Sequence, residues 1–230
     1  MTWRRVGTAV LVVAAALAAL SAARPGPARG PLTGEELERV VAAAREATAL
    51  VSSEWCGQRV RGSAFAVDGH LVTNSHVVGG APLVHVAASG SVWRVPVLAV
   101  HDRLDLSVLA GVGTRDLELA PARPEPGDPV VLAGRPGGGA VTVATSEVHL
   151  YAEGRPWGVA GDVLLLDHPT GPGWSGGPVL DRHGRVVAVL AARDEVTGLA
   201  VAIPLGDLAA WLDDPPPEHR PAATCGRPRP

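Results

Sequence analysis

Three short segments of the chain carry side chains that together could make a serine into a nucleophile. They contain, in chain order, His76 in TNSHVV, Asp105 in LDLSVL and Ser175 in GPGWSGGP. A serine hydroxyl is a weak nucleophile at neutral pH, so it needs a base within hydrogen-bond reach and a third group that fixes the tautomer of that base. We therefore predict that Ser175 is a catalytic nucleophile, that His76 is its general base and that Asp105 orients His76.

The glycines around Ser175 predict an oxyanion hole, the second feature that catalysis by a serine requires. A tetrahedral intermediate carries a negative oxygen, and two backbone N–H groups that converge on one point can stabilise it. Side chains would obstruct the tight turn that presents those N–H groups, which explains a glycine-rich segment at this place. We assign the oxyanion hole to the amides of Gly173 and Ser175.

The predicted triad and its serine turn have two alternatives. The sequence around Ser175 also matches the G-x-S-x-G turn of α/β-hydrolases, in which a helix follows the serine and the acid and the histidine come later in the chain. Here Pro178 leads into a hairpin-like run and only 55 residues follow Ser175, so this alternative is disfavoured. Asp102 could replace Asp105 as the orienting acid, but it lies in a turn-like segment.

The elements that would position these residues are mostly short strands. Runs rich in valine, leucine and alanine recur between turn signals from residue 56 to residue 203, without intervening helices. Strands with this spacing predict a barrel or a sandwich rather than βαβ units. Segment 113–128 contains three prolines and lacks strand character. It divides the strands into two sets, as a connector between two barrels would.

The sequence also predicts how the chain is divided. Thr33 and Glu36 form a capping box at the start of a helical run, and a second, short helix is expected at 205–212. The predicted parts are a signal peptide or membrane anchor at 1–23, a linker at 24–32, an N-terminal helix at 33–55, a strand-rich domain at 56–212 with barrels at about 56–112 and 128–204, and a Pro-rich tail at 213–230.

The N-terminus has the parts of an export signal. Arg4 and Arg5 precede an apolar run over residues 6–23 that ends in small residues, which is typical of a signal peptide. The run is 18 residues long, near the lower limit for an uncleaved membrane anchor. Either alternative predicts an extracytoplasmic protein, secreted or periplasmic.

The two cysteines, Cys56 and Cys225, agree with export. In an oxidising compartment a lone pair is more often bridged than free, so we predict a disulfide between them, with two free thiols as the alternative. Their wide separation lacks the C-x-x-C spacing of a metal site. We expect neither a metal nor a cofactor.

The composition argues against two classes of protein. The formal net charge is −3, from 20 basic and 23 acidic residues, and without a basic excess no nucleic-acid partner is expected. Apolar residues make up 47% of the chain, which excludes a disordered scaffold.

Taken together, the segments TNSHVV, LDLSVL and GPGWSGGPVLD resemble the trypsin-fold serine proteases of the bacterial HtrA type. Within that family the chain is similar to the protease domain of periplasmic MarP-type acid-resistance proteases, which also has CG-x-x-x-x-GS-x-F before the histidine motif and a cysteine in the C-terminal tail. The resemblance implies an all-β fold of two antiparallel six-stranded barrels with the catalytic residues at their junction. It also implies a serine endopeptidase that acts on proteins or peptides through an acyl-enzyme.

Trp174 departs from the family pattern, which usually has Asn or Asp before the catalytic serine. Tryptophan has no charge with which to bind a newly freed N-terminal ammonium, so activation by that route is not expected. We hypothesise that Trp174 contacts substrate or closes part of the cleft. If it distorts the oxyanion turn, the alternative function is a protease-like module that binds extracytoplasmic peptides or proteins without cleaving them; an esterase is a third candidate.

The residues that recognise the substrate are expected near the nucleophile. We predict a P1 pocket lined by segments 168–172, 190–192 and 197–201, with a preference for small or medium apolar side chains. The sequence makes no prediction of the oligomeric state.

Overall fold

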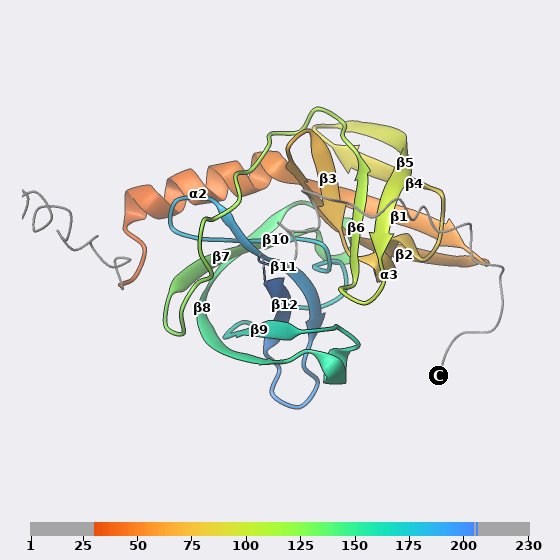
Figure 1. Cartoon of the computed structure of the whole chain (residues 1–230). Coiled ribbons are helices and arrows are strands. Elements are labelled where there is room, and N and C mark those ends of the chain that lie inside the picture. Colours follow the sequence, from red (N-terminus) through yellow and green to blue (C-terminus); the bar gives the residue numbers. More distant parts are fainter. Residues whose placement is uncertain (1–29, 205, 207–230) are drawn as a thin grey trace, which may run out of the picture. The chain divides into compact units, whose positions relative to one another are not determined.

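Two closed antiparallel β-barrels of six strands each make up most of the computed structural model, which describes residues 30–204 and residue 206 (Figure 1). This arrangement confirms the predicted all-β fold. The first barrel contains β1 (Thr48–Trp55), β2 (Gln58–Val67), β3 (His70–Thr73), β4 (Leu83–Ala88), β5 (Ser91–His101) and β6 (Leu106–Ala110), in the order β1-β2-β3-β6-β5-β4. The second contains β7 (Pro129–Gly134), β8 (Thr142–Glu153), β9 (Asp162–Leu166), β10 (Pro178–Leu180), β11 (Val186–Arg193) and β12 (Ala200–Pro204), in the order β10-β11-β12-β9-β8-β7.

The strands differ in how they divide their side chains between the core and the surface. In β4, the side chains of Val84, Val86 and Ala88 are buried, while those of Leu83 and His85 are exposed. This alternation follows from the two-residue period of a strand with one wet face. In contrast, β11 is buried over six consecutive residues, because both of its faces are covered.

Helix α2 (Gly34–Ala47) covers part of the second barrel, where it packs against β7, β8 and β10. Its first turn has the predicted capping box: Thr33 Oγ1 accepts from Glu36 N at 3.2 Å and Thr33 N donates to Glu36 Oε2 at 2.8 Å. The buried residues Val40 and Ala44 belong to the same apolar cluster as the core of the second barrel. An amphipathic helix is stabilised mainly by such packing.

The predicted helix at 33–55 is too long. Helix α2 ends at Ala47, and residues from Thr48 to Trp55 form strand β1, which pairs with β2 and β4 and closes the first barrel. The first barrel therefore begins at Thr48 rather than at residue 56. The reason is the sequence TALVSSEW, whose β-branched and small polar residues favour a half-buried strand over a helix. Because an alanine-rich helical run precedes this segment directly, the change from a helical to a strand pattern is hard to recognise in the sequence.

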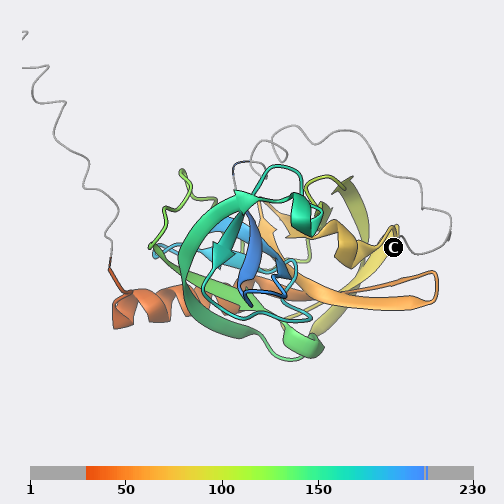
Figure 2. The ribbon, with the colours of Figure 1, turned by 90° about the horizontal axis from the view of Figure 1, so that it is seen from below.

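The two barrels meet along strands β1, β2 and β7. Figures 1 and 2 show the barrels side by side from two directions. The connector between them follows both surfaces: Leu117 N donates to Ala66 O at 2.8 Å, and Ala120 N donates to Val186 O at 2.9 Å. Three short helical turns complete the described part, namely α3 (Ser75–Val78), η1 (Pro136–Gly138) and η2 (Arg155–Trp157).

Several predicted segments lie outside the described residues. These are the signal peptide or anchor at 1–23, most of the linker at 24–32, the short helix at 205–212 apart from residue 206, and the tail at 213–230 with Cys225. Within the described ranges, no helix has both the length and the apolar character needed to cross a membrane.

Candidate active site

His76 and Asp105 come from two neighbouring segments of the first barrel. His76 lies in the single turn of helix α3, directly after β3, and Asp105 lies in the loop that leads into β6. Strands β3 and β6 are paired, so the two segments leave the barrel side by side. Asp105 has a φ of 54°, in the left-handed region, and its backbone oxygen accepts from Asn74 Nδ2 at 2.9 Å. This bond holds the loop against the start of α3.

The carboxylate of Asp105 binds His76 at two points. Asp105 Oδ2 lies 2.7 Å from His76 Nδ1, and Oδ1 accepts from the His76 backbone N–H at 2.9 Å. Oδ1 also accepts from Ser75 Oγ at 2.9 Å. Three donors thus fix the orientation of the carboxylate, and a carboxylate can only accept. The proton of a neutral His76 is therefore held on Nδ1, which leaves Nε2 as an acceptor that faces away from Asp105.

Ser175 belongs to the turn that precedes β10 in the second barrel, and β2 links it to the first barrel. The backbone N–H of Ser63 donates to Ser175 O at 2.7 Å. The two barrels approach each other closely at Gly62. A Cβ at this position would lie 2.6 Å from Val77 Cγ2 in the first barrel and 2.8 Å from Ser175 O in the second. Val77 follows His76 in helix α3. The structure thus brings the segments of all three predicted triad residues to the junction of the barrels.

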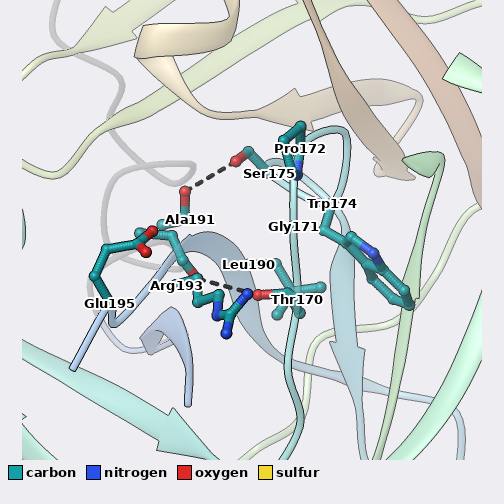
Figure 3. Close-up of a pocket in the computed structure, with 10 residues that line it drawn as sticks. Thr170, Gly171, Pro172, Trp174, Ser175, Leu190, Ala191, Arg193 and Glu195 are labelled. Carbon is teal, nitrogen blue, oxygen red and sulfur yellow. Dashed lines mark hydrogen bonds between the residues drawn. The ribbon is translucent and has the colours of Figure 1, made fainter. Parts of the chain in front are cut away.

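The hydroxyl of Ser175 is not hydrogen-bonded to His76. It donates to the backbone oxygen of Ala191 at 2.9 Å (Figure 3). The hydroxyl oxygen changes position by rotation about χ1, between staggered rotamers. Breaking the bond to Ala191 costs about 0.5–1.5 kcal/mol in net terms, which is small compared with the barrier to hydrolysis of a peptide bond.

The turn before Ser175 presents two backbone N–H groups. Pro172 O accepts from Gly137 N, and Gly173 O accepts from Arg135 N, each at 3.3 Å. In a trans peptide the N–H points opposite to the C=O, so the bond at Pro172 turns the Gly173 N–H away from Gly137. Among the described residues, the N–H groups of Gly173 and Ser175 have no acceptor, so both are available to a bound oxyanion.

A pocket of about 250 Å³ opens beside Ser175. Figure 3 shows its lining, which includes Arg193 and Glu195 as well as apolar side chains. The predicted segments 168–172 and 190–192 contribute to this lining, whereas none of the residues 197–201 does. The lining residues are Thr170, Gly171, Pro172, Trp174, Ser175, Leu190, Ala191, Ala192, Arg193 and Glu195.

Trp174 is buried, with 7% of its surface exposed, and its ring lies on the other side of the turn from Ala191 and Glu195 (Figure 3). The ring packs against His168 with centroids 5.8 Å apart. It also fills the space beside Gly134, where a Cβ would lie 2.8 Å from Trp174 Cε3. The indole belongs to the apolar cluster that includes the core of the second barrel, and it packs behind the turn that carries Ser175.

Two charged groups near the site have shifted pKa values. Burial lowers the pKa of Arg135, next to the oxyanion turn. In the loop between β11 and β12, hydrogen bonds from the side chain and backbone of Thr197 hold the pKa of Asp194 below its usual value.

Sequence reasoning missed two serines that contact the candidate triad and the oxyanion turn. Ser75 donates to Asp105, and Ser63 donates to Gly173 O at 2.7 Å. Ser75 has a local signal, since it immediately precedes His76. Ser63 has none, because its partner lies 110 residues away in the chain. In the described part of the chain, no cluster of metal-ligating side chains is present.

Comparison with known proteins supports the same family. The model of the trypsin-like peptidase domain matches residues 62–189. The chain is 28% identical over 172 residues to the serine protease Rv3671c of Mycobacterium tuberculosis, which covers 68% of this chain and 42% of that protein. It is 31% identical over 154 residues to a probable periplasmic serine endoprotease DegP-like of Bartonella henselae, which covers 62% of this chain and 31% of that protein.

The fold is also that of a solved protease. The structure of the Rv3671c protease from M. tuberculosis in its active form superimposes with a TM-score of 0.71 at 24% identity, covering 84% of this chain and 93% of that one. The chain spans less than half the length of these two full-length relatives, 42% and 31%.

Proposed function

Since the chain belongs to the trypsin-like peptidase family, we propose that it is an exported serine endopeptidase with His76, Asp105 and Ser175 as its catalytic triad. The observation that carries the proposal is the contact of Asp105 Oδ2 with His76 Nδ1 at 2.7 Å. This contact leaves Nε2 of His76 free to accept a proton, and Ser175 lies in a turn with two unused N–H groups. A base with a fixed tautomer, a serine and an oxyanion site are the parts that acyl transfer needs.

In the proposed reaction, the Ser175 hydroxyl turns from Ala191 O toward His76 and attacks the carbonyl carbon of the scissile peptide. Its proton passes to Nε2 of His76, and the carboxylate of Asp105 stabilises the resulting imidazolium. The negative oxygen of the intermediate accepts from the N–H groups of Gly173 and Ser175. The C–N bond then breaks, and the leaving amine takes the proton from His76. Water, deprotonated by His76, attacks the carbonyl carbon of the ester, the C–O bond to Ser175 breaks, and His76 returns the proton to Ser175 Oγ.

The pocket beside Ser175 is proposed to bind the P1 side chain of a protein or peptide. Its volume of about 250 Å³ and its apolar residues Leu190 and Ala191 favour small or medium apolar side chains. Arg193 and Glu195 contribute opposite charges to the lining. Because these charges offset one another, the pocket has no net charge that would select strongly for an acidic or a basic P1 residue.

Export is supported by the sequence before the domain and by the printed name of a relative. Residues 6–23 have the character of a signal peptide or membrane anchor, and the similar protein of B. henselae is named a periplasmic endoprotease. We place the protein outside the cytoplasm. N-terminal sequencing of the mature protein separates the two forms of export, with a start after Ala23 expected for a cleaved signal and an intact N-terminal segment for a retained anchor.

A disulfide between Cys56 and Cys225 is part of the same proposal. Cys56 lies at the turn between β1 and β2 with a φ of 51°. The bridge would close a loop of 169 residues, which in the chain-entropy model stabilises the fold by up to about 5 kcal/mol. Alkylation without a reductant should leave the mass unchanged, whereas alkylation after reduction should modify two thiols. Two reactive thiols before reduction would contradict the bridge.

A module that binds peptides without cleaving them is the second candidate. One observation favours it, namely the bond from the Ser175 hydroxyl to Ala191 O in place of one to His76. It predicts saturable peptide binding with no turnover.

The experiment that separates the two candidates combines cleavage of fluorescein-labelled casein with labelling by an alkyl fluorophosphonate. The endopeptidase predicts cleavage and labelling by the wild type, and loss of both in Ser175→Ala. Ser146→Ala, in β8 and outside the site, serves as the control and should retain both. A folded wild type that is neither labelled nor active on casein would contradict the proposed enzyme.

A further inference from the structure

We propose that Ser63, in strand β2 of the first barrel, is a positioning residue that holds the oxyanion turn of the second barrel in its working geometry. The inference rests on the proposed function, because it assigns a role to a residue outside the triad. Ser63 is completely buried, with 0% of its surface exposed. Burying a serine hydroxyl costs free energy unless the hydroxyl is hydrogen-bonded.

Each polar group of Ser63 has a partner. Its N–H donates to Ser175 O at 2.7 Å, and its backbone oxygen accepts from Thr73 Oγ1 at 2.7 Å. Its hydroxyl donates to Gly173 O at 2.7 Å and accepts from Arg135 N at 2.8 Å. One residue therefore joins β3 of the first barrel to both ends of the turn that carries the candidate oxyanion hole.

The hydroxyl makes the shortest of the bonds that hold the two carbonyls on either side of the Gly173 nitrogen and α-carbon, Pro172 O and Gly173 O. The Gly173 N–H lies in the peptide plane that contains Pro172 O. The next peptide plane, which contains Gly173 O, restrains that N–H through the backbone dihedrals of Gly173. Pro172 O is held by Gly137 N at 3.3 Å, and Gly173 O by Arg135 N at 3.3 Å. Both are near the long limit for a hydrogen bond, whereas the Ser63 bond to Gly173 O is 2.7 Å.

Gly173 needs such an external restraint. Its φ of 96° lies in a region that glycine enters and leaves easily, because it has no Cβ. An oxyanion hole is effective only if its donors are already aimed at the oxygen before the reaction. Without the Ser63 hydroxyl, the turn would retain its weaker bonds, but the Gly173 N–H would sample other directions.

The expected size of the effect follows from oxyanion holes in general. Loss of one donor lowers the rate about 10²–10³-fold. Ser63 acts on a donor through one hydrogen bond rather than as the donor itself. We therefore expect the labelling rate constant of Ser63→Ala to fall about 10–100-fold.

The test measures labelling of Ser175 by an alkyl fluorophosphonate, whose phosphoryl oxygen occupies the oxyanion position. Rate constant and labelled fraction are recorded separately for the wild type, Ser63→Ala and Ser63→Cys; the cysteine variant keeps the approximate size but offers only a weak donor. The matched control is Ser107→Ala, because Ser107 is equally buried in β6 and its hydroxyl has no partner in the described part of the chain.

The inference predicts that the rate constant falls in the order wild type, Ser63→Cys, Ser63→Ala, that the labelled fraction stays complete, and that Ser107→Ala matches the wild type. A purely structural role would instead lower the labelled fraction and leave the rate constant unchanged. That outcome, or a rate constant for Ser63→Ala within twofold of the wild type, overturns the inference. If Ser63→Ala does not fold, Ser63→Cys decides by the same criteria. Failure of the wild type to react would count against the proposed function instead.

Discussion

The substitution Asp105→Asn tests how the carboxylate controls the tautomer of His76. Asp105 Oδ1 accepts from His76 N and from Ser75 Oγ, both at 2.9 Å, and Oδ2 faces His76 Nδ1 at 2.7 Å. An asparagine has one carbonyl oxygen and one NH₂ group in these two places. The oxygen is expected at the Oδ1 position, where two donors converge. The NH₂ group then faces Nδ1 of His76, which must accept, and the proton moves to Nε2.

This tautomer cannot accept the proton of Ser175, so the chemical step should be strongly slowed. In trypsin-type triads, the corresponding change lowers kcat about 10⁴-fold while the geometry is retained. At about 1.36 kcal/mol for each factor of ten, this corresponds to about 5.4 kcal/mol of lost transition-state stabilisation. The folded structure should be little affected, because the groups that contact the side chain at this position would all still have hydrogen-bond partners.

The assay is the rate of casein cleavage and of fluorophosphonate labelling near neutral pH, with the unfolding temperature measured in parallel. Asp102→Asn is the matched control, since Asp102 is exposed and lies three residues away in the same loop. We expect the control to retain most of its activity. A loss of less than tenfold in Asp105→Asn, or an equal loss in Asp102→Asn, would refute the assignment of Asp105 as the orienting acid.

Three further predictions concern the surroundings of the site. Gly134→Ala places a Cβ 2.8 Å from Trp174 Cε3 and 3.0 Å from its Cα. The unfolding temperature should therefore fall by about 5 °C, and the labelling rate should fall with it. Unchanged values of both would contradict the close packing of Trp174 against Gly134. Glu195→Gln should raise cleavage after acidic relative to basic P1 residues, and Arg193→Gln should do the reverse. The measurement uses fluorogenic peptides that differ only at P1. P1 profiles of both variants identical to that of the wild type would exclude both residues from P1 recognition. Hydrogen bonds to the N-cap lower the pKa of Glu36, so its carboxylate stabilises the fold above its unfolded pKa and this contribution disappears as the pH falls through the folded value. The difference in unfolding temperature between wild type and Glu36→Gln should therefore be present at pH 7 and shrink as the pH falls below the unfolded pKa of about 4.5. A difference that does not change with pH would contradict this.

Local patterns in the sequence were sufficient for most of the fold. The two sets of short strands and the proline-containing segment 113–128 predict two barrels and their connector, and the capping box at Thr33 predicts where helix α2 begins. The end of that helix was not predictable in the same way. Thr48–Trp55 becomes a strand because it pairs with β2 and β4, and such long-range pairing overrides the helical pattern that precedes it.

The candidate site shows the same division between local and long-range information. Residue types and their order indicate His76, Asp105 and Ser175, because each lies in a short segment with its own chemical character. The roles of Ser63 and Arg193 depend on contacts that the sequence does not encode locally. Ser63 meets Gly173 only when two barrels pack together, and Arg193 lies at the end of β11, beside a loop that directs it to the pocket.

The most direct test of the central claim is a crystal structure of the protein after reaction with diisopropyl fluorophosphate. We predict phosphorus bonded to Ser175 Oγ, His76 Nε2 within hydrogen-bond distance of the phosphoryl group, and the phosphoryl oxygen accepting from the N–H groups of Gly173 and Ser175. A structure in which Ser175 is unmodified and still bonded to Ala191 O, or in which the phosphoryl oxygen lies away from both N–H groups, would contradict the account.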